Sequence, residues 1–324
     1  MKYDVYGIGN AIMDYEIKAT EKFLKTFHVE KGLMTLVDED RQKELVAGVF
    51  GQIKKRQSGG SAANSMIALA QFGGKGFYSC KVANDEDGVH YKQEMDELGV
   101  DTSLGELPNG TTGKCLVMVT PDAERTMNTY LGITANLSVD EINEEALSQA
   151  KYIYVEGYLV SSPTGIVAIR KVKELAKKHG VKIAYTFSDP AMVKFFRDES
   201  HEAVSGGIDL LFANEEEAKT FTGKSNDKEA FEALKQYAKQ FVMTRSEKGA
   251  WVFDGENHIK ISGQAVEAID TTGAGDMFAG AFLYGMTNGL SHKEAGDLAS
   301  LASARVVTQF GPRLENDVAA ALIS

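Results

Sequence analysis

The sequence predicts an α/β fold with a mostly parallel central sheet that helices cover on both faces. Short apolar runs typical of buried strands recur along the second half of the chain, and segments with helical spacing separate them. These runs occupy residues 152–156, 181–187, 209–213 and 241–243. Alternation of strands and helices along a chain favours parallel pairing.

Helix starts are marked at several points of this alternation. Ser162 stands directly before Pro163, an arrangement common at the first turn of a helix. Two capping-box pairs, with Ser followed three residues later by Glu, mark further starts. These pairs are Ser138 with Glu141 and Ser291 with Glu294.

The first 130 residues interrupt the alternation with additional segments that have strand-like composition. These segments are residues 11–18, 33–37, 49–57 and 113–130. An opening strand at residues 3–9 contains Gly7 and Gly9, as a dinucleotide-binding fingerprint would. Ile12 stands where its third glycine belongs, however, and no helical pattern follows, so an NAD-dependent oxidoreductase is only a minor alternative.

Residues 58–65 (Ser-Gly-Gly-Ser-Ala-Ala-Asn-Ser) form a glycine-containing turn that opens an apolar helix. Taken alone, this run is explained by a strand-to-helix turn with Ser61 as the N-cap. Asn214 and Glu217 likewise stand where a strand ends and a helix begins, and helix capping explains them equally simply.

The most informative segment is residues 270–280, Asp-Thr-Thr-Gly-Ala-Gly-Asp-Met-Phe-Ala-Gly. Gly273 and Gly275 leave room for a ligand to approach the main chain, and the helix that follows is apolar in nearly every direction. The amides of Ala274, Gly275 and Asp276 at its start would bind phosphate or a developing oxyanion. The Asp276 carboxylate suits a general base, although capping of this helix is the alternative.

These runs resemble the two signatures of the ribokinase family, also called PfkB carbohydrate kinases. Residues 270–276 resemble the C-terminal signature and residues 58–65 the N-terminal one, and the likeness extends over essentially the whole chain. Within the family it favours the adenosine-kinase-like branch. The resemblance implies a single ribokinase-like domain, residues 1–324, in which the early strand-like insertions form a small β-sheet lid over the substrate.

The resemblance also implies a role for each part of the site. Asp276 would remove the proton of the acceptor hydroxyl, beside an anion hole formed by Gly273, Ala274 and Gly275. The residues that would bind the acceptor are Asn10, Asp14, Gly59, Gly60, Asn64, Arg125 and Phe187. Those that would bind the nucleotide are Asn214, Thr244, Gly249, Thr272, Gly273 and Gly275. Asn214 and Glu217 would order Mg²⁺ through water, since Mg²⁺ retains several waters and takes few protein ligands.

Simpler interpretations remain open for several of these positions. A position in an exposed loop is a reasonable explanation of Asn10 and a weaker one of Asp14. A solvated charge in a hairpin explains Arg125 as well as phosphate binding does. Phe187 has the composition of a core aromatic at a strand end. Ser246 replaces the glycine usual in the nucleotide-binding segment, which leaves Thr244 and Gly249 as its expected contacts.

Composition excludes several other classes of protein. The chain has 324 residues, 43% of them hydrophobic, and a formal net charge of -11, which disfavours nucleic acid or an anionic membrane as a partner. Its two cysteines, Cys80 and Cys115, lie in apolar runs, so a disulfide framework is not expected. No apolar run approaches the ~18 residues of a spanning helix, and we expect a cytoplasmic protein.

We therefore expect a kinase that uses ATP and Mg²⁺ to phosphorylate a primary hydroxyl of a nucleoside, with adenosine as the first acceptor to test. A sugar kinase acting on ribose, fructose or 2-keto-3-deoxygluconate is the alternative among enzymes. A non-catalytic nucleoside or sugar sensor is the alternative from another class. K⁺ beside the anion hole is a further cofactor that some members of the family hold, and both a monomer and a homodimer are compatible with the sequence.

Overall fold

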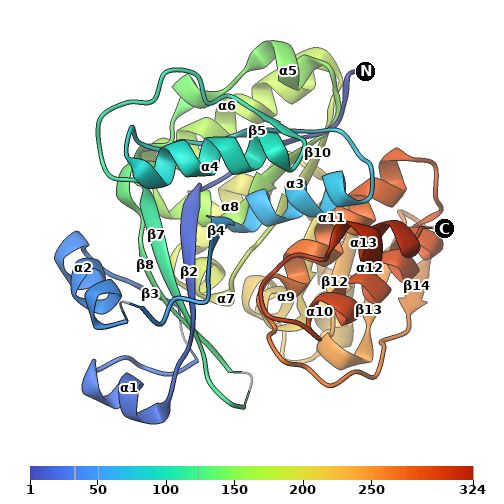
Figure 1. Cartoon of the computed structure of the whole chain (residues 1–324). Coiled ribbons are helices and arrows are strands. Elements are labelled where there is room, and N and C mark those ends of the chain that lie inside the picture. Colours follow the sequence, from blue (N-terminus) through green and yellow to red (C-terminus); the bar gives the residue numbers. More distant parts are fainter. Residues whose placement is uncertain (33, 50, 123, 324) are drawn as a thin grey trace.

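The computed structural model describes residues 1–32, 34–49, 51–122 and 124–323, and in them a large sheet and a small sheet (Figure 1). The large sheet has the strand order β14-β13-β12-β11-β10-β9-β1-β5-β6. Its strands are β1 (Tyr3–Ile8), β5 (Gly76–Ser79), β6 (Val100–Thr102), β9 (Ala150–Glu156), β10 (Lys182–Thr186), β11 (Ile208–Asn214), β12 (Ala238–Thr244), β13 (Ala250–Phe253) and β14 (His258–Ile261). Pairing is parallel from β6 to β12, and only β13 and β14 pair antiparallel. The expected mostly parallel sheet is thus confirmed.

Helices cover both faces of the large sheet, and alternate residues of its strands enter two separate apolar cores. In β9, Tyr152 and Tyr154 pack on one side, whereas Ile153 and Val155 pack on the other. The first core is covered by α3 (Ser61–Gln71), α4 (Glu86–Glu97), α11 (Ala274–Thr287), α12 (His292–Val306) and α13 (Asn316–Ala321). The second is covered by α5 (Glu144–Ser148), α6 (Pro163–His179), α7 (Pro190–Phe195), α8 (Arg197–Val204), α9 (Glu215–Thr222) and α10 (Asp227–Leu234).

Most helix starts lie where the local signals predicted them. Ser162 caps α6 with Pro163 in its first turn, and Ser291 forms a capping box with Glu294 at the start of α12. The box between Ser138 and Glu141 also forms, but it opens only the 3-10 turn η2 (Val139–Glu141). The other 3-10 turns are η1 (Gly132–Asn136), η3 (Gly157–Ser161) and η4 (Ser246–Lys248).

The small sheet, which we call the lid sheet, has the strand order β3-β8-β7-β2-β4. Its strands are β2 (Ile12–Lys18), β3 (Met34–Leu36), β4 (Lys55–Gly59), β7 (Gly113–Val119) and β8 (Arg125–Tyr130). The expected strand over 49–57 is wrong in its first half, because Val49 ends a helix and Gly51, with φ +81°, lies in the turn that precedes β4. Leu33 and Phe50, which belong to the expected strand segments, lie outside the described residues.

The two faces of the lid sheet differ in what covers them. Its outer face packs against α1 (Glu21–Thr26) and α2 (Glu39–Gly48), which lie on the side away from the large sheet (Figure 1). The apolar cluster there includes Ile17, Leu24, Leu45 and Met118. The inner face, which includes Asp14, borders a cavity between the two sheets.

Two further observations bear on the excluded classes. After β1 the chain enters β2 of the lid sheet rather than a helix, so the dinucleotide-binding arrangement is not formed. Gly7 and Gly9 instead allow close packing, because an added Cβ would lie 2.8 Å from Met66 and 2.5 Å from Glu156. None of the helices in the described part of the chain combines the length and the apolar composition needed to cross a membrane.

Candidate active site

A cavity of about 810 Å³ lies between the lid sheet and the ends of the large-sheet strands. Asn10, Glu156, Thr186, Asn214 and Thr244 line it, and each stands at or just after the carboxyl end of a strand. Ligands of open α/β sheets bind at this edge. The cavity continues from the lid sheet past the start of α11 to α12.

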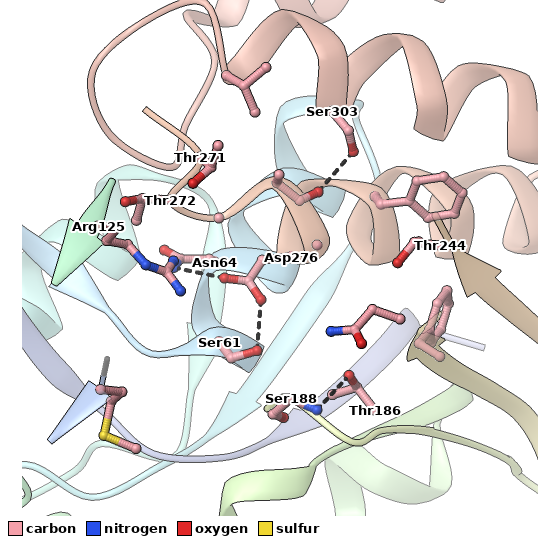
Figure 2. A pocket seen from close by; sticks show the side chains of 18 of the residues that line it. Ser61, Asn64, Arg125, Thr186, Ser188, Thr244, Thr271, Thr272, Asp276 and Ser303 are labelled. Atoms are coloured by element: carbon pink, nitrogen blue, oxygen red, sulfur yellow. Dashed lines mark hydrogen bonds between the residues drawn. The ribbon is translucent and has the colours of Figure 1, made fainter. Parts of the chain in front are cut away.

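Asp276 lines this cavity and is held by two side chains of α3. Ser61 Oγ donates a hydrogen bond of 2.7 Å to one of its carboxylate oxygens, and Asn64 Nδ2 donates one of 3.2 Å to the other (Figure 2). Ser61 is therefore not an N-cap, because Gly60 occupies that position and Ser61 is the first helical residue. The side chain of Asp276 makes no capping bond either, since α11 begins without a side-chain cap. The helices α3 and α11 thus fix the carboxylate in one orientation.

Burial raises the pKa of Asp276 above its ordinary value. The hydrogen bonds from Ser61 and Asn64, and the nearby charge of Arg125, lower it by less than burial raises it. The sequence alone does not show how far this carboxylate is enclosed, so the raised pKa could not be predicted from it. A base with a raised pKa holds a transferred proton more firmly.

The turn before α11 is shaped by Gly273, which has φ +72° and packs so closely on the loop after α12 that an added Cβ would lie 2.3 Å from Pro312 Cβ. The amides of Gly275 and Asp276, in the first turn of α11, have no partner within the helix and point to its N-terminal side. Ser303 Oγ of α12 donates to the carbonyl of Ala274 at 2.8 Å and so fixes this turn (Figure 2). The geometry suits an anion hole.

Asp14 lies on strand β2 of the lid sheet and borders the cavity. Only 7% of it is exposed, and its pKa is raised to about 8, first by burial and then by the negative charge of Glu16. Gly59 of the neighbouring strand makes room for this carboxylate, because an added Cβ would lie 2.1 Å from Asp14 Oδ2. The expectation that Gly59 touches the acceptor is thus wrong in detail: it does not line the cavity, whereas Gly60 does.

Asn10 is buried and is held by a residue that the sequence analysis missed. Its backbone amide and its Nδ2 donate to Glu156 Oε1 at 3.1 and 3.0 Å, and its Oδ1 accepts a hydrogen bond from Thr134. Glu156 also accepts from the amide of Ala62 at 2.8 Å, is fully buried, and has a pKa raised to about 7 by burial. The exposed-loop interpretation of Asn10 is therefore wrong. An acid at the carboxyl end of a predicted strand was the available signal for Glu156.

Arg125 extends from strand β8 into the cavity, toward the carboxylate of Asp276 (Figure 2). Its charge lowers the pKa of both Asp276 and Asp14. This placement favours anion binding over the solvated hairpin charge that was the alternative.

Phe187 does not belong to the site, and its predicted role in binding the acceptor is wrong. It is 1% exposed and packs against Phe221 with ring centroids 4.6 Å apart, within the second core. Its neighbours Thr186 and Ser188 line the cavity instead. Successive residues of an extended chain point to opposite sides, and Phe187 has the parity that points into the core.

Asn214 and Glu217 form a capping box at the start of α9. Asn214 Oδ1 accepts from the amides of Glu216 and Glu217 at 2.9 and 2.8 Å, and Glu217 Oε2 accepts from the amide of Asn214 at 2.8 Å. The capping interpretation is thus confirmed, and both side chains also line the cavity. Burial raises the pKa of Glu217 to about 8. The residues that the structure describes contain no group of three or more His, Cys, Asp or Glu side chains able to hold a metal ion.

The far part of the cavity contains the residues predicted to bind the nucleotide. Thr244, Gly249 and Thr272 all line it, and Gly249 has φ +86°. Sequence reasoning missed residues 263–266 and 268, as well as Ser300, Ser303 and Ala304 of α12, which complete this part. Apart from Gln264, they are small or apolar residues, and they carry no motif of their own.

Comparison with known sequences and structures shows which proteins this chain is similar to. Residues 39–319 match the sequence model for pfkB family carbohydrate kinases. The chain belongs to this family. It is therefore a phosphotransferase with an alcohol group as acceptor, as expected from the two signatures.

Relatives with different substrates in their names are similar to this chain. A crystal structure of adenosine kinase from Sinorhizobium meliloti is 35% identical, with a TM-score of 0.92 and coverage of 100% of both chains. Ribokinase from Haemophilus influenzae is 29% identical over 81% of this chain and 84% of its own length. Adenosine kinase from Saccharomyces cerevisiae is 24% identical over 94% of this chain and 95% of its own length. The ribokinase-like fold and the adenosine-kinase-like resemblance are confirmed, and the chain is a kinase of small-molecule nucleosides or sugars.

Proposed function

We propose that this kinase transfers the γ-phosphate of ATP to the primary hydroxyl of a nucleoside, with adenosine as the first acceptor. The observation that carries this choice is the apolar inner face of the lid sheet. Ile12, Met34, Leu36, Val117 and Met127 line the cavity on the side of Asp14. A free sugar would leave hydroxyl groups facing these side chains without hydrogen-bond partners, whereas a nucleobase could cover them.

The same geometry suggests how the ribose would be held. A carboxylate accepts two hydrogen bonds, so Asp14 suits a vicinal diol. Asn64 and Gly60 lie beside the cavity between Asp14 and Asp276 and would contact the rest of the sugar. The primary hydroxyl would then lie near the carboxylate of Asp276.

In the reaction, a bond forms between the acceptor oxygen and the γ-phosphorus while the bond from phosphorus to the leaving oxygen of ADP breaks. Asp276 accepts the hydroxyl proton, and Ser61 and Asn64 keep its oxygens oriented. The amides at the start of α11 and the Arg125 guanidinium stabilise the charge on the transferring group. When bound, Mg²⁺ neutralises phosphate charge; Asn214 and Glu217 would hold its waters.

Monovalent-ion activation remains part of the proposal. Thr272 Oγ1 is buried and has no hydrogen-bond partner in the described part of the chain, and it lies two residues from the buried acid Asp270. Such an oxygen fits a K⁺ ligand. Rates measured in KCl and in tetramethylammonium chloride test this, and equal rates would contradict it. The cytoplasmic location, the single-domain organisation and the choice between monomer and homodimer stay predictions.

The experiment that tests the proposal is ADP formation from ATP and Mg²⁺ with parallel acceptors: adenosine, inosine, guanosine, cytidine, ribose, fructose and 2-keto-3-deoxygluconate. We expect turnover with nucleosides and adenosine at least among them. Turnover with a sugar alone would contradict the nucleoside assignment. Binding of acceptors without any turnover would favour a sensor.

A further inference from the structure

The loop of residues 309–313 lies between the lid sheet and the start of α11 and contacts both. Phe310 packs against the inner-face cluster of the lid sheet, which consists of Cys115, Val117 and Val119. The amide of Gly311 donates to Asp270 Oδ2 at 2.9 Å, and Pro312 packs directly on Gly273. Asp270 in turn accepts from the amide of Thr272 at 2.8 Å. A displacement of this loop would therefore reach the turn that precedes α11.

On the lid side, two charged side chains converge on the same loop. Glu16 of β2 and Lys55 of β4 are directly opposite each other in the antiparallel register. A Cβ added to Gly311 would lie 3.0 Å from Lys55 Nζ and 3.3 Å from Glu16 Oε2. Glu16 also lies two residues from Asp14 on β2, so both point to the inner face. One strand therefore carries both the expected diol ligand and a carboxylate beside the loop.

The environment of Glu16 is costly for a carboxylate. The residue is fully buried, and Oε1 accepts a hydrogen bond of 2.8 Å from Gln57. Oε2 has no hydrogen-bond partner within the described residues. The charges that act on it come from Lys55 and Arg313, which favour its ionised form, and from Asp270, which disfavours it. An apolar side chain would serve the stability of the lid sheet better, so packing alone does not account for Glu16.

We propose that Glu16 and Lys55 are positioning residues for phosphoryl transfer: together they hold Gly311, and through Asp270 and Gly273 they keep the start of α11 in register with Asp14. Neither residue lines the cavity. The pair acts on the distance and angle between the acceptor hydroxyl and the transferring phosphoryl group. A change in this distance or angle lowers the rate of the chemical step more than it weakens acceptor binding. The inference rests on the proposed anion hole at residues 273–276.

The test is a double-mutant cycle with Glu16→Gln, Lys55→Met and the combined variant. We expect each single variant to lower kcat by about tenfold, with the acceptor KM changed less than about twofold. The combined variant is expected to be no slower than the worse single one, because the two side chains act as a unit. Unchanged kcat, a change in KM alone, or independent multiplication of the two effects would overturn the proposal.

A readout that does not need activity is amide hydrogen exchange of the purified variants. We expect faster exchange in peptides that cover residues 268–276 and 308–313 in Glu16→Gln, and unchanged exchange across α1 and α2. A merely structural role of Glu16 in the lid sheet would instead loosen β2, β4 and their helices together. Faster exchange throughout the lid sheet, with unchanged exchange in the two loops, would contradict the proposal.

Gly311→Ala offers a second route, with Gly289→Ala as its matched control. Both glycines have positive φ, +94° and +87°, so alanine is strained at both, but only at Gly311 would the Cβ meet Lys55 and Glu16. We expect both variants to lose stability, Gly311→Ala at least as much as Gly289→Ala, and only Gly311→Ala to lose kcat. If the wild-type protein phosphorylates no acceptor, the proposed function fails. If the wild-type protein phosphorylates an acceptor and the Glu16→Gln and Gly311→Ala variants have the same kcat as the wild type, only this inference fails.

Discussion

Replacement of Asp276 by Asn separates the loss of a base from a loss of structure. The amide has nearly the shape of the carboxylate, and it can keep both present contacts: its oxygen can accept from Asn64 Nδ2 while its nitrogen donates to Ser61 Oγ. The protein therefore should fold without a new unpaired group. It also loses a buried carboxylate whose pKa burial has raised, so the free energy of unfolding should not fall.

The catalytic cost of this change follows from the role of a general base. Such a group contributes about 10²–10⁴ in rate, which corresponds to about 2.7–5.4 kcal/mol of transition-state free energy. We expect kcat of Asp276→Asn to fall by about a thousandfold with the acceptor KM nearly unchanged, because the amides and Arg125 remain in place. ADP release with saturating adenosine and ATP measures this.

The control is Asp297→Asn, which makes the same chemical change on a half-exposed side chain of α12 that pairs with Lys293. It should leave kcat at the wild-type value. A rate for Asp276→Asn within about tenfold of wild type would refute the assignment of the base, since so small a loss is below the contribution of a positioned proton acceptor. In the wild type, kcat should fall as pH drops through a pKa above the ordinary aspartate value of 3.8, because Asp276 must be ionised to accept the proton.

Three further predictions follow from the packing around the site. Gly59→Ala should displace the Asp14 carboxylate and raise the acceptor KM by about tenfold or more, whereas Gly105→Ala, where an added Cβ meets no atom within 4 Å, should change neither KM nor stability; equal KM values would contradict the packing argument. The folded pKa of about 8 for Asp14 is far above its ordinary 3.8, so the folded state binds this proton more tightly and its contribution to stability is lost as pH rises from about 4 to 8. Asp14→Asn should make that decline shallower but not abolish it, because the raised pKa values of Glu156 and Glu217 act in the same pH range; thermal unfolding from pH 4 to 8 measures this, acceptor binding should weaken, and an unchanged pH profile would count against burial as the cause. Phe187→Leu should lower the free energy of unfolding by about 1 kcal/mol through core packing and leave the KM for adenosine unchanged, and a raised KM would restore its predicted role in binding.

The parts of the fold that sequence predicted well are those specified by local signals. Ser162 and Ser291 mark helix starts because a cap needs only residues within one turn, and buried parallel strands are continuous apolar runs. The Ser138–Glu141 box shows the limit of this reasoning. Its hydrogen bonds form, but whether a long helix follows depends on the packing beyond it.

The site was predicted where a glycine turn or an acid marked it and missed where placement depends on distant segments. Ser61 was interpreted as a cap, but its partner Asp276 lies 215 positions further along the chain. Phe187 was wrongly assigned to the site because the sequence does not show which side of β10 faces the cavity. That side decides whether residue 187 points into the cavity or into the core. Glu156 belongs to no sequence motif. It is part of the site because the fold brings the amides of Asn10 and Ala62 within hydrogen-bonding distance of its carboxylate.

The outer face of the lid sheet has a consequence for how the enzyme works in dilute solution. Ile17, Leu24, Leu45 and Met118 form a closed apolar layer in which α1 and α2 of the same chain occupy the surface that a second copy would otherwise need. A partner could use this face only by displacing those helices and exposing the layer to water, which costs about 25 cal/mol per Å². Helices of the same chain thus cover the outer face of the lid sheet. Specific activity should therefore not depend on association through this face when the protein is diluted from micromolar to nanomolar concentration.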